Sequence, residues 1–253
     1  LLTFNDRELL ELLEPLKKKA QKERIINKIS QRRQLGIAMY ELEELTNQGY
    51  YLIFRSQMPK RLKKLEAKLR PAFFYAVGDN RILNSDFTLG VVGSRNATKE
   101  ELSVVESICT EASNKEIVIV SGGAKGIDLT ATTAALKNGG KAIIFPSTGI
   151  GEFLKAQDNL QYIQNGQLLV LSTQSTYTRF TGAYAMERNK FIHVCGDNVL
   201  IGASEISTAK KSGTWEGVQE NIKFKWSPLY GVGDSPGVKE VLNQKQADLY
   251  TSL

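Results

Sequence analysis

The segment SGGAKGID, Ser121 to Asp128, follows an apolar run at Ile117–Val120 and leads into a helix-like segment at Leu129–Leu136. The order is strand, glycine-rich turn, helix. Glycines in such a turn let the backbone approach an anion closely, and the free N–H groups at the helix start then point toward it. The segment therefore predicts an α/β unit with a phosphate-binding turn.

Two further small-residue turns have the same setting. VVGSRN, Val91–Asn96, follows a strand-like run and precedes a helix, and KKSGTWE, Lys210–Glu216, follows the apolar run Val199–Ala203 after a short loop. Ligands of parallel sheets bind beyond the carboxyl ends of the strands. Because all three turns fall at those ends, we expect them to converge in one pocket.

From about Phe73 onward, strand-like and helix-like segments alternate. This alternation predicts an α/β fold with a mostly parallel sheet and helices on both faces. The expected strands are 88–92, 117–120, 141–145, 167–172, 199–202 and 227–229, and the expected helices are 99–113, 127–138, 160–164, 183–193, 214–224 and 237–244.

Residues 1–49 have a helical pattern. Apolar residues recur at helical spacing over Asp6–Leu13, with Asn5 or Asp6 as the cap, and a further helix fits Gln34–Asn47 and stops at Gly49. We therefore expect a small N-terminal helical domain.

The region that joins this domain to the sheet combines a strand-like and a helix-like pattern. Tyr50–Phe54 is a short strand candidate, and Lys60–Leu69 has the pattern of a basic helix that Pro71 ends. We divide the chain into an N-terminal helical domain and linker at 1–75 and a sheet domain at 76–253.

Charge is uneven along the 253 residues, whose net charge is +6. Residues 1–70 hold 16 Lys and Arg against 9 Asp and Glu, and the rest is nearly balanced. A basic lobe favours a nucleic-acid partner, although a solvated helical surface gives the same pattern. There is no apolar run of about 18 residues, so no membrane span is expected. Cys109 and Cys195 fit buried thiols, which indicates a cytoplasmic protein.

The turns carry side chains that suit phosphate. Arg95 could fork onto a phosphate, Lys125 adds charge, and the neighbouring glycines supply backbone donors, while Asp128 is expected to cap the following helix. The alternative interpretation of VGSR, Val92–Arg95, is a tight turn between strand and helix with an arginine on the surface. The spacings GxxxxGK[ST] and GxGxxG are absent, so neither a Walker loop nor a dinucleotide is the first choice.

A basic and aromatic segment follows further along the chain. Arg188-Asn-Lys190 comes after Tyr177-Thr-Arg-Phe180, a combination that suits single-stranded nucleic acid, although an exposed basic patch beside core aromatics is the alternative. His193 is the only histidine and lies in an apolar stretch, so we expect it to be packed. We therefore expect no catalytic residue, no metal site and no cofactor.

In this order the motifs resemble those of the DprA/Smf family of DNA-processing proteins. The family pattern has VG[ST]R, then SGxAxGIDxxA, then an Asn-bearing loop, RNR and SG[ST]. The matching residues are Val92–Arg95, Ser121–Asp128 with Ala131, Asn159, Arg188–Lys190 and Ser212–Thr214, within a likeness over roughly residues 50–245. The chain departs from the pattern at Thr132, where His is common, and at Ala185-Met186, where Phe-Pro is common.

The resemblance implies an extended Rossmann-like domain that binds single-stranded DNA. In the family it also implies homodimers and loading of the RecA recombinase. The candidate DNA- or phosphate-binding residues are Gly93, Ser94, Arg95, Ser121, Gly122, Gly123, Lys125, Gly126, Arg179, Arg188, Asn189, Lys190, Ser212, Gly213 and Thr214, with Tyr177, Phe180 or Tyr184 as base-stacking rings.

Two other functions remain open. A nucleotide hydrolase of the LOG type has the pattern GGxGTxxE, which Gly213-Thr214 matches in part, but Gly217 stands where the Glu is required. Its Met-x-x-Arg is also unmatched, because Met186 is one residue too close to Arg188. The third interpretation is a nucleotide-sensing regulator or antitoxin without chemistry. Turnover of nucleotides, or binding without turnover, would distinguish these from a protein that prefers oligonucleotides.

Overall fold

The computed structural model describes residues 19–30, 35–156, 159–207 and 212–252, together with Arg7 and Glu11. Its contacts divide into two units, 1–50 and 51–253. The helix expected at Asp6–Leu13 lies almost wholly outside the described residues, as do Gln34, Lys210 and Lys211.

The first unit contains helices α2 (Lys19–Ser30) and α3 (Leu35–Asn47). After α3 the chain forms a turn at Gly49, whose φ is +80°. The Gly49 and Tyr50 N–H groups donate to the carbonyls of Thr46 and Leu45, at 2.9 Å each. Glycine is favoured at this position because a Cβ would be strained there, and it ends the helix where the sequence predicts.

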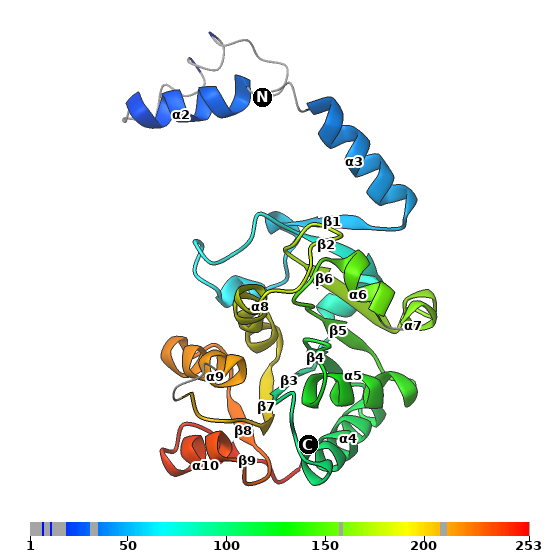
Figure 1. Ribbon diagram of the computed structural model, residues 1–253, viewed down its shortest axis with the longest axis vertical. Helices are drawn as coiled ribbons and strands as arrows, with labels where there is room; N and C mark the ends of the chain where they lie inside the picture. The colour runs from blue at the N-terminus through cyan, green and yellow to red at the C-terminus, as the bar shows by residue number, and fades with distance from the viewer. Residues whose placement is uncertain are drawn as a thin grey trace. The chain divides into compact units, whose positions relative to one another are not determined.

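The described residues of the second unit form one nine-stranded sheet in the order β1-β2-β6-β5-β4-β3-β7-β8-β9. All pairings are parallel except β1 with β2 and β2 with β6 (Figure 1). The strands are β1 (Tyr51–Phe54), β2 (Phe73–Gly78), β3 (Thr88–Gly93), β4 (Val118–Ser121), β5 (Ala142–Ile144), β6 (Leu168–Ser172), β7 (Asn198–Ala203), β8 (Leu229–Gly231) and β9 (Asp248–Leu249).

Strand order changes direction at β3. The chain adds β4, β5 and β6 on one side of β3 and then returns to place β7, β8 and β9 on the other. Ligands of doubly wound sheets bind at the point where this reversal opens a crevice, beyond the carboxyl ends of the strands. Here that point lies between β3 and β7.

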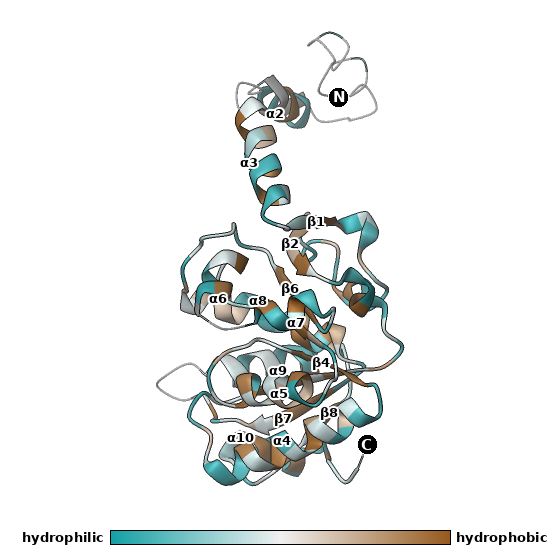
Figure 2. Cartoon of the chain, turned by 90° about the vertical axis from the view of Figure 1, so that its right-hand side faces the viewer, coloured by the Kyte–Doolittle hydropathy of each residue, from teal (hydrophilic) through white to brown (hydrophobic). Residues whose placement is uncertain are grey.

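Helices cover both faces of the sheet, as the alternating pattern predicts (Figure 1). One apolar cluster joins α4 and α5 to the sheet, and a second joins α8, α9 and α10 to its other face. In Figure 2 the most apolar residues lie mainly along the strands between these layers. The helices are α4 (Lys99–Asn114), α5 (Ile127–Lys137), α6 (Ile150–Ala156), α7 (Leu160–Gln164), α8 (Gly182–Cys195), α9 (Gly213–Phe224) and α10 (Pro236–Asn243).

The region between residues 51 and 75 differs from the expectation. Since β1 pairs with β2 and β2 pairs with β6, the sheet unit begins at Tyr51 and not at residue 76. The basic helix predicted at Lys60–Leu69 is wrong: only the short 3₁₀ turn Leu62–Lys64 forms, and Leu62 and Leu65 are fully buried.

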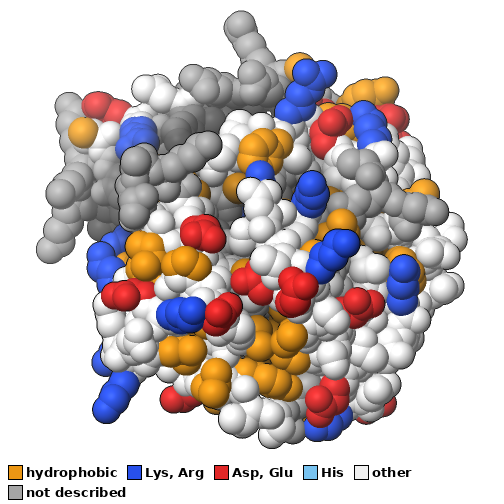
Figure 3. Space-filling model, turned by 60° about the horizontal axis from the view of Figure 1, so that its bottom comes forward, with side chains coloured by type: hydrophobic (Ala, Val, Ile, Leu, Met, Phe, Trp, Pro, Cys, Tyr) orange, Lys and Arg blue, Asp and Glu red, His pale blue; other side chains and the backbone are white. Residues whose placement is uncertain are grey.

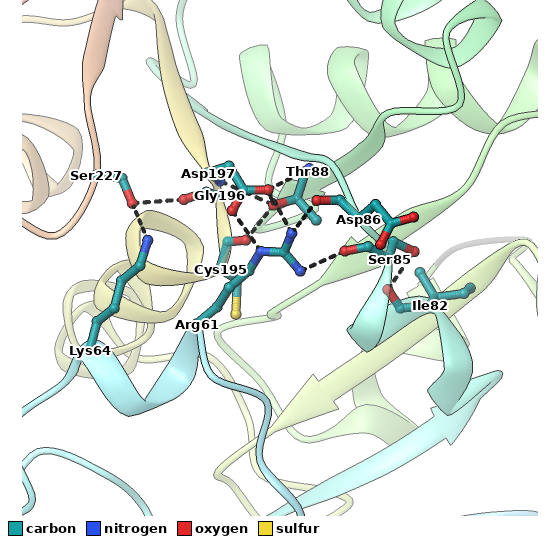
Figure 4. A network of polar contacts seen from close by, with 10 residues as sticks. All are labelled: Arg61, Lys64, Ile82, Ser85, Asp86, Thr88, Cys195, Gly196, Asp197 and Ser227. Carbon is teal, nitrogen blue, oxygen red and sulfur yellow. Dashed lines mark hydrogen bonds and ion pairs between the residues drawn. The ribbon is translucent and has the colours of Figure 1, made fainter.

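Arg61 binds this segment to the sheet (Figure 4). Its Nε donates to Asp197 Oδ1 at 2.8 Å, and its other nitrogens donate to the carbonyls of Ser85 and Asp86 at 2.7 and 2.8 Å. Burial raises the pKa of the Asp197 carboxyl, but the hydrogen bonds and charge of Arg61, with bonds from Thr88, hold it below its ordinary value. The segment is thereby fixed to the amino ends of β3 and β7.

None of the helices within the described ranges combines the length and the apolar character needed to cross a membrane.

Candidate nucleic-acid interface

The three small-residue turns converge in one pocket, as their shared edge predicts. Its volume is about 480 Å³. The residues that carry the argument are Gly93, Ser94, Arg95 and Asn96 after β3, Ala124 and Asp128 around the start of α5, Phe180, Gly182 and Arg188 around and within α8, and Ser212, Gly213 and Thr214 at the start of α9.

Direct hydrogen bonds join the turns to one another. The Ser94 N–H donates to the Ala203 carbonyl at 2.9 Å, across the β3–β7 reversal. The Ile127 N–H donates to the Ser94 carbonyl at 3.2 Å, and the Thr214 hydroxyl donates to the Gly93 carbonyl at 3.0 Å. Hydrogen bonds between the turns therefore hold the pocket together at the point where the strand order reverses.

Two glycines of SGGAKGID, Gly122 and Gly126, allow neighbouring groups to lie against the backbone where a Cβ would clash. Gly126 has a φ of +88°, and a Cβ there would lie 2.3 Å from the Ser94 carbonyl oxygen. A Cβ on Gly122 would lie 1.5 Å from Arg188 Nη1. Gly122 thus leaves the space that the Arg188 guanidinium occupies.

Arg188 and Asp128 form a buried ion pair at the pocket wall. Arg188 Nη2 lies 3.0 Å from Asp128 Oδ2, and the two residues are only 6% and 5% exposed. Burial raises the pKa of the Asp128 carboxyl, while Arg188 and the Gly93 N–H act against that rise. The sequence predicted that Asp128 caps α5, and this prediction is wrong. Gly126 is the N-cap residue, and Asp128 binds Arg188 instead.

The rest of the Arg188 guanidinium lacks partners. Its Nε and Nη1 are buried without a hydrogen bond to any described residue. Leaving such donors unpaired costs about 1–3 kcal/mol or more for a charged group. Both atoms have almost no accessible surface, so Arg188 contributes positive charge from within the pocket wall, and its ion pair with Asp128 offsets part of that charge.

Three helices begin at the pocket. The α8 cap is Thr181, whose hydroxyl accepts from the Tyr184 N–H at 3.1 Å, and the α9 cap is Ser212, which accepts from the Trp215 N–H at 3.4 Å. The other amides of a first helical turn have no partner within the helix, and the helix dipole adds positive potential there. The starts of α5, α8 and α9 therefore all favour an anion at this place.

Arg95 and Phe180 form the rim of the pocket. The Arg95 guanidinium carbon lies 4.8 Å from the centre of the Phe180 ring. Arg95 is exposed, and Phe180 is 48% exposed. A cation held beside an accessible ring suits a nucleotide, because one group can meet a phosphate and the other a base.

Three candidate residues make contacts that hold the fold around the pocket. Ser121 is fully buried, and its hydroxyl donates to the Val91 carbonyl at 2.7 Å within the sheet. A Cβ on Gly123 would meet Phe153 at 2.9 Å, so Gly123 lies against α6. Asn189 lines the pocket and also donates to the Gly213 carbonyl at 2.8 Å, which fixes the start of α9 to α8.

The remaining candidates lie outside the pocket lining. Lys125 and Arg179 are exposed neighbours of the lining residues Ala124 and Phe180. Lys190 lines a different groove, with its Nζ 3.7 Å from Glu187.

The aromatic candidates divide in the same way. Tyr177 lies beside Lys155, whose Nζ is 4.7 Å from the ring centre, and it does not line the pocket. Tyr184 is half-buried in the first turn of α8. Of the three rings, only Phe180 lines the pocket.

Gly182 lines the pocket at the start of α8 and is not among the site residues predicted from the sequence. Thr181 followed by a helical pattern is a cap signal that could have placed this helix start. The partner of Asp128 had no such local signal, because Arg188 is 60 residues away.

His193 is fully buried on α8, as expected, and burial together with the Arg188 charge lowers its pKa to about 3. Within the described ranges, no group of three or more His, Cys, Asp or Glu residues is arranged to hold a metal ion.

Comparison with known proteins finds relatives for most of the sheet unit. A family model described as DNA recombination-mediator protein A matches residues 50–233. The chain is 48% identical over 84 residues to DNA processing protein DprA of Streptococcus pneumoniae and 30% identical over 146 residues to DprA of Bacillus subtilis. These stretches cover 32% and 57% of this chain and only 29% and 48% of the two relatives. The matched stretches of sequence thus span less than half the length of these relatives.

Two solved structures have the same fold. DNA processing protein A from Helicobacter pylori, studied for its single-stranded DNA binding mode, has a TM-score of 0.66 at 25% identity and covers 79% of this chain and 89% of its own. DprA from Streptococcus pneumoniae has a TM-score of 0.71 at 23% identity and covers 99% of this chain and 92% of its own. With the matched residues 50–233 making up most of the sequence, the chain belongs to the DNA recombination-mediator protein A family.

Proposed function

We propose that this chain binds single-stranded DNA through its phosphates at the pocket and performs no covalent chemistry on it. The observation that carries the proposal is the convergence of the three small-residue turns, with the exposed Arg95, at one pocket. The starts of α5, α8 and α9 surround the same space and favour an anion there. The Helicobacter pylori relative, studied for single-stranded DNA binding, supports the same ligand.

The rim favours a single strand over a duplex. Phe180 and Arg95 offer one ring and one cation side by side, and stacking on a ring requires a base that is free of its complementary strand. Over the described part of the face in Figure 3, basic and acidic side chains are interspersed. The proposal therefore rests on the pocket and not on a uniformly basic surface.

The nucleotide-hydrolase alternative lacks a carboxylate where it needs one. Position 217 holds glycine, and even a Cβ there would lie 3.1 Å from His193 Nε2 and 3.2 Å from Asn189 Cβ. A side chain at this position would press against these two residues of α8. This packing speaks against hydrolysis of a nucleotide by α9.

We further propose that the DNA-bound chain acts as a homodimer and loads a RecA-type recombinase. The family description as a recombination mediator supports this role. A strand-exchange assay on DNA coated with a single-strand-binding protein tests it: the chain should raise the rate of recombinase filament formation, and an unchanged rate contradicts the proposal.

The ligand itself is tested by a binding comparison. Labelled single-stranded DNA, duplex DNA of the same sequence and a nucleoside monophosphate are titrated with the protein, and the nucleotide is assayed for turnover. We expect the single strand to bind most tightly, with no turnover. Tighter binding of the free nucleotide would support a sensor, and its hydrolysis would support an enzyme.

A further inference from the structure

A second groove adjoins the pocket on the surface of α8 and α9. Its volume is about 420 Å³, and Met186 lines both the groove and the pocket. Helices α8 and α9 pack side by side (Figure 1), so the groove lies along their contact. The lining residues that matter here are Lys68, Met186, Lys190, Lys223, Phe224 and Trp226.

The groove contains an exposed aromatic surface. Phe224 stacks on Trp226 with ring centres 5.3 Å apart and an angle of 12° between the planes. Phe224 is 36% exposed, whereas Trp226 is 7% exposed and belongs to the core. The buried Trp226 therefore supports a Phe224 ring that is partly open to solvent, which is the arrangement of a base-stacking platform.

Lys223 is the cation best placed to bind a ligand. Lys190 lies 3.7 Å from Glu187, and Lys68 lies 2.8 Å from Glu66, so carboxylates already offset both charges. Lys223 is exposed and forms no ion pair with the described residues, and its Nζ lies 5.3 Å from the Phe224 ring centre. Its flexible stem allows the ammonium to move from the ring to a phosphate.

Helix α9 links the pocket to the groove. It begins at the pocket with Gly213 and Thr214 and ends at Phe224. Phe224 lies ten positions after Thr214, which corresponds to about 15 Å at the rise of an α-helix. We propose that a strand held in the pocket continues along α9, with a base on Phe224 and a phosphate at Lys223; this inference rests on the proposed function.

Oligonucleotide length tests the inference. Oligothymidylates of about 4 and about 16 nucleotides, which bracket common single-strand sites, are titrated against the unaltered chain, Lys223→Ala, Phe224→Ala and Arg95→Ala. Lys137→Ala is the matched control, since Lys137 is an exposed lysine at the far end of α5. We expect Lys223→Ala and Phe224→Ala to weaken the long oligomer about tenfold and the short one less than twofold.

The outcomes separate this inference from the proposed function. If Arg95→Ala weakens both oligomers while Lys223→Ala weakens neither, the strand binds the pocket and does not continue along α9, and the inference is overturned. Equal loss for both lengths in Lys223→Ala also overturns it. If Arg95→Ala changes nothing, the proposed function itself fails. Because Lys223 is exposed, its substitution keeps the test valid even if Phe224→Ala destabilises the fold.

Discussion

His193 links the folded state to pH at the scale of a single residue. It is fully buried, and neither ring nitrogen has a hydrogen-bond partner among the described residues. Burial first, and the Arg188 charge second, lower its pKa to about 3. An unfolded chain has a histidine pKa of about 6.5. Between these values only the unfolded state takes up the proton, so stability is complete above about pH 6.5 and falls as the pH decreases.

We therefore predict that the free energy of unfolding falls by about 2 kcal/mol between about pH 7.5 and pH 5, through this one group. Urea denaturation at both values measures the loss. In His193→Leu, which cannot titrate, the two measurements should agree more closely. An identical pH dependence in both proteins would show that His193 is not the group responsible.

Gly122 controls the position of Arg188. A Cβ would lie 1.5 Å from Arg188 Nη1, so Gly122→Ala must move the guanidinium away from Asp128. Breaking a buried ion pair costs about 3–5 kcal/mol when a partner is removed outright, and we expect Gly122→Ala to cost about 3 kcal/mol and to weaken DNA binding. Gly36→Ala is the control, because no atom lies within 4 Å of its Cβ position. Full stability and full binding in Gly122→Ala would contradict the role given to Arg188.

At the scale of helices, the cap of α9 stabilises its helix and also lines the pocket, whereas the cap of α4 only stabilises its helix. Ser212 caps α9 at the pocket, whereas Thr98 caps α4 outside the pocket lining, in a reciprocal pair with Glu101. Replacing either cap by Ala should cost about 1 kcal/mol of stability. Only Ser212→Ala should also weaken single-stranded DNA binding, because it disturbs the start of α9. Equal affinity in the two variants, measured by fluorescence anisotropy, would mean that α9 does not contact the ligand.

The elements that the sequence predicts well are those with local signals. The helix expected at 99–113 is α4, Lys99–Asn114, whose Thr98 and Glu101 form a capping box. The strand expected at 88–92 is β3, Thr88–Gly93, which is buried up to its last residue. Lys60–Leu69 has helical residues too, but Arg61 binds Asp197 across the fold, and long-range contacts decide its conformation.

For the candidate site, too, the sequence predicts the features with local signals and not those that depend on long-range packing. The convergence of three turns follows from strand topology, which the alternating pattern already contains. The pairing of Arg188 with Asp128, and the need for Gly122 beside it, depend on how α8 packs over the end of β4. No spacing rule predicts that packing. The sequence therefore predicts where the pocket lies, but not which buried side chains form its wall.

At the scale of the whole molecule, the sheet unit from Tyr51 onward contains the pocket, the groove and both apolar clusters. We predict that removing residues 1–49 leaves a folded sheet domain that still binds single-stranded DNA. Circular dichroism and thermal unfolding of the shortened chain measure this. An unfolded or insoluble product would mean that the two units share one core.

The central claim is that the pocket binds the phosphates of single-stranded DNA, and the salt dependence of Arg95→Ala tests it most directly. Arg81→Ala is the matched control, since Arg81 is an exposed arginine that follows β2 at the opposite edge of the sheet. Each lost phosphate contact lowers the slope of log affinity against log salt by about one unit. We predict that Arg95→Ala loses affinity and about one unit of slope while Arg81→Ala keeps both; equal effects of the two substitutions would show diffuse attraction and contradict a defined site.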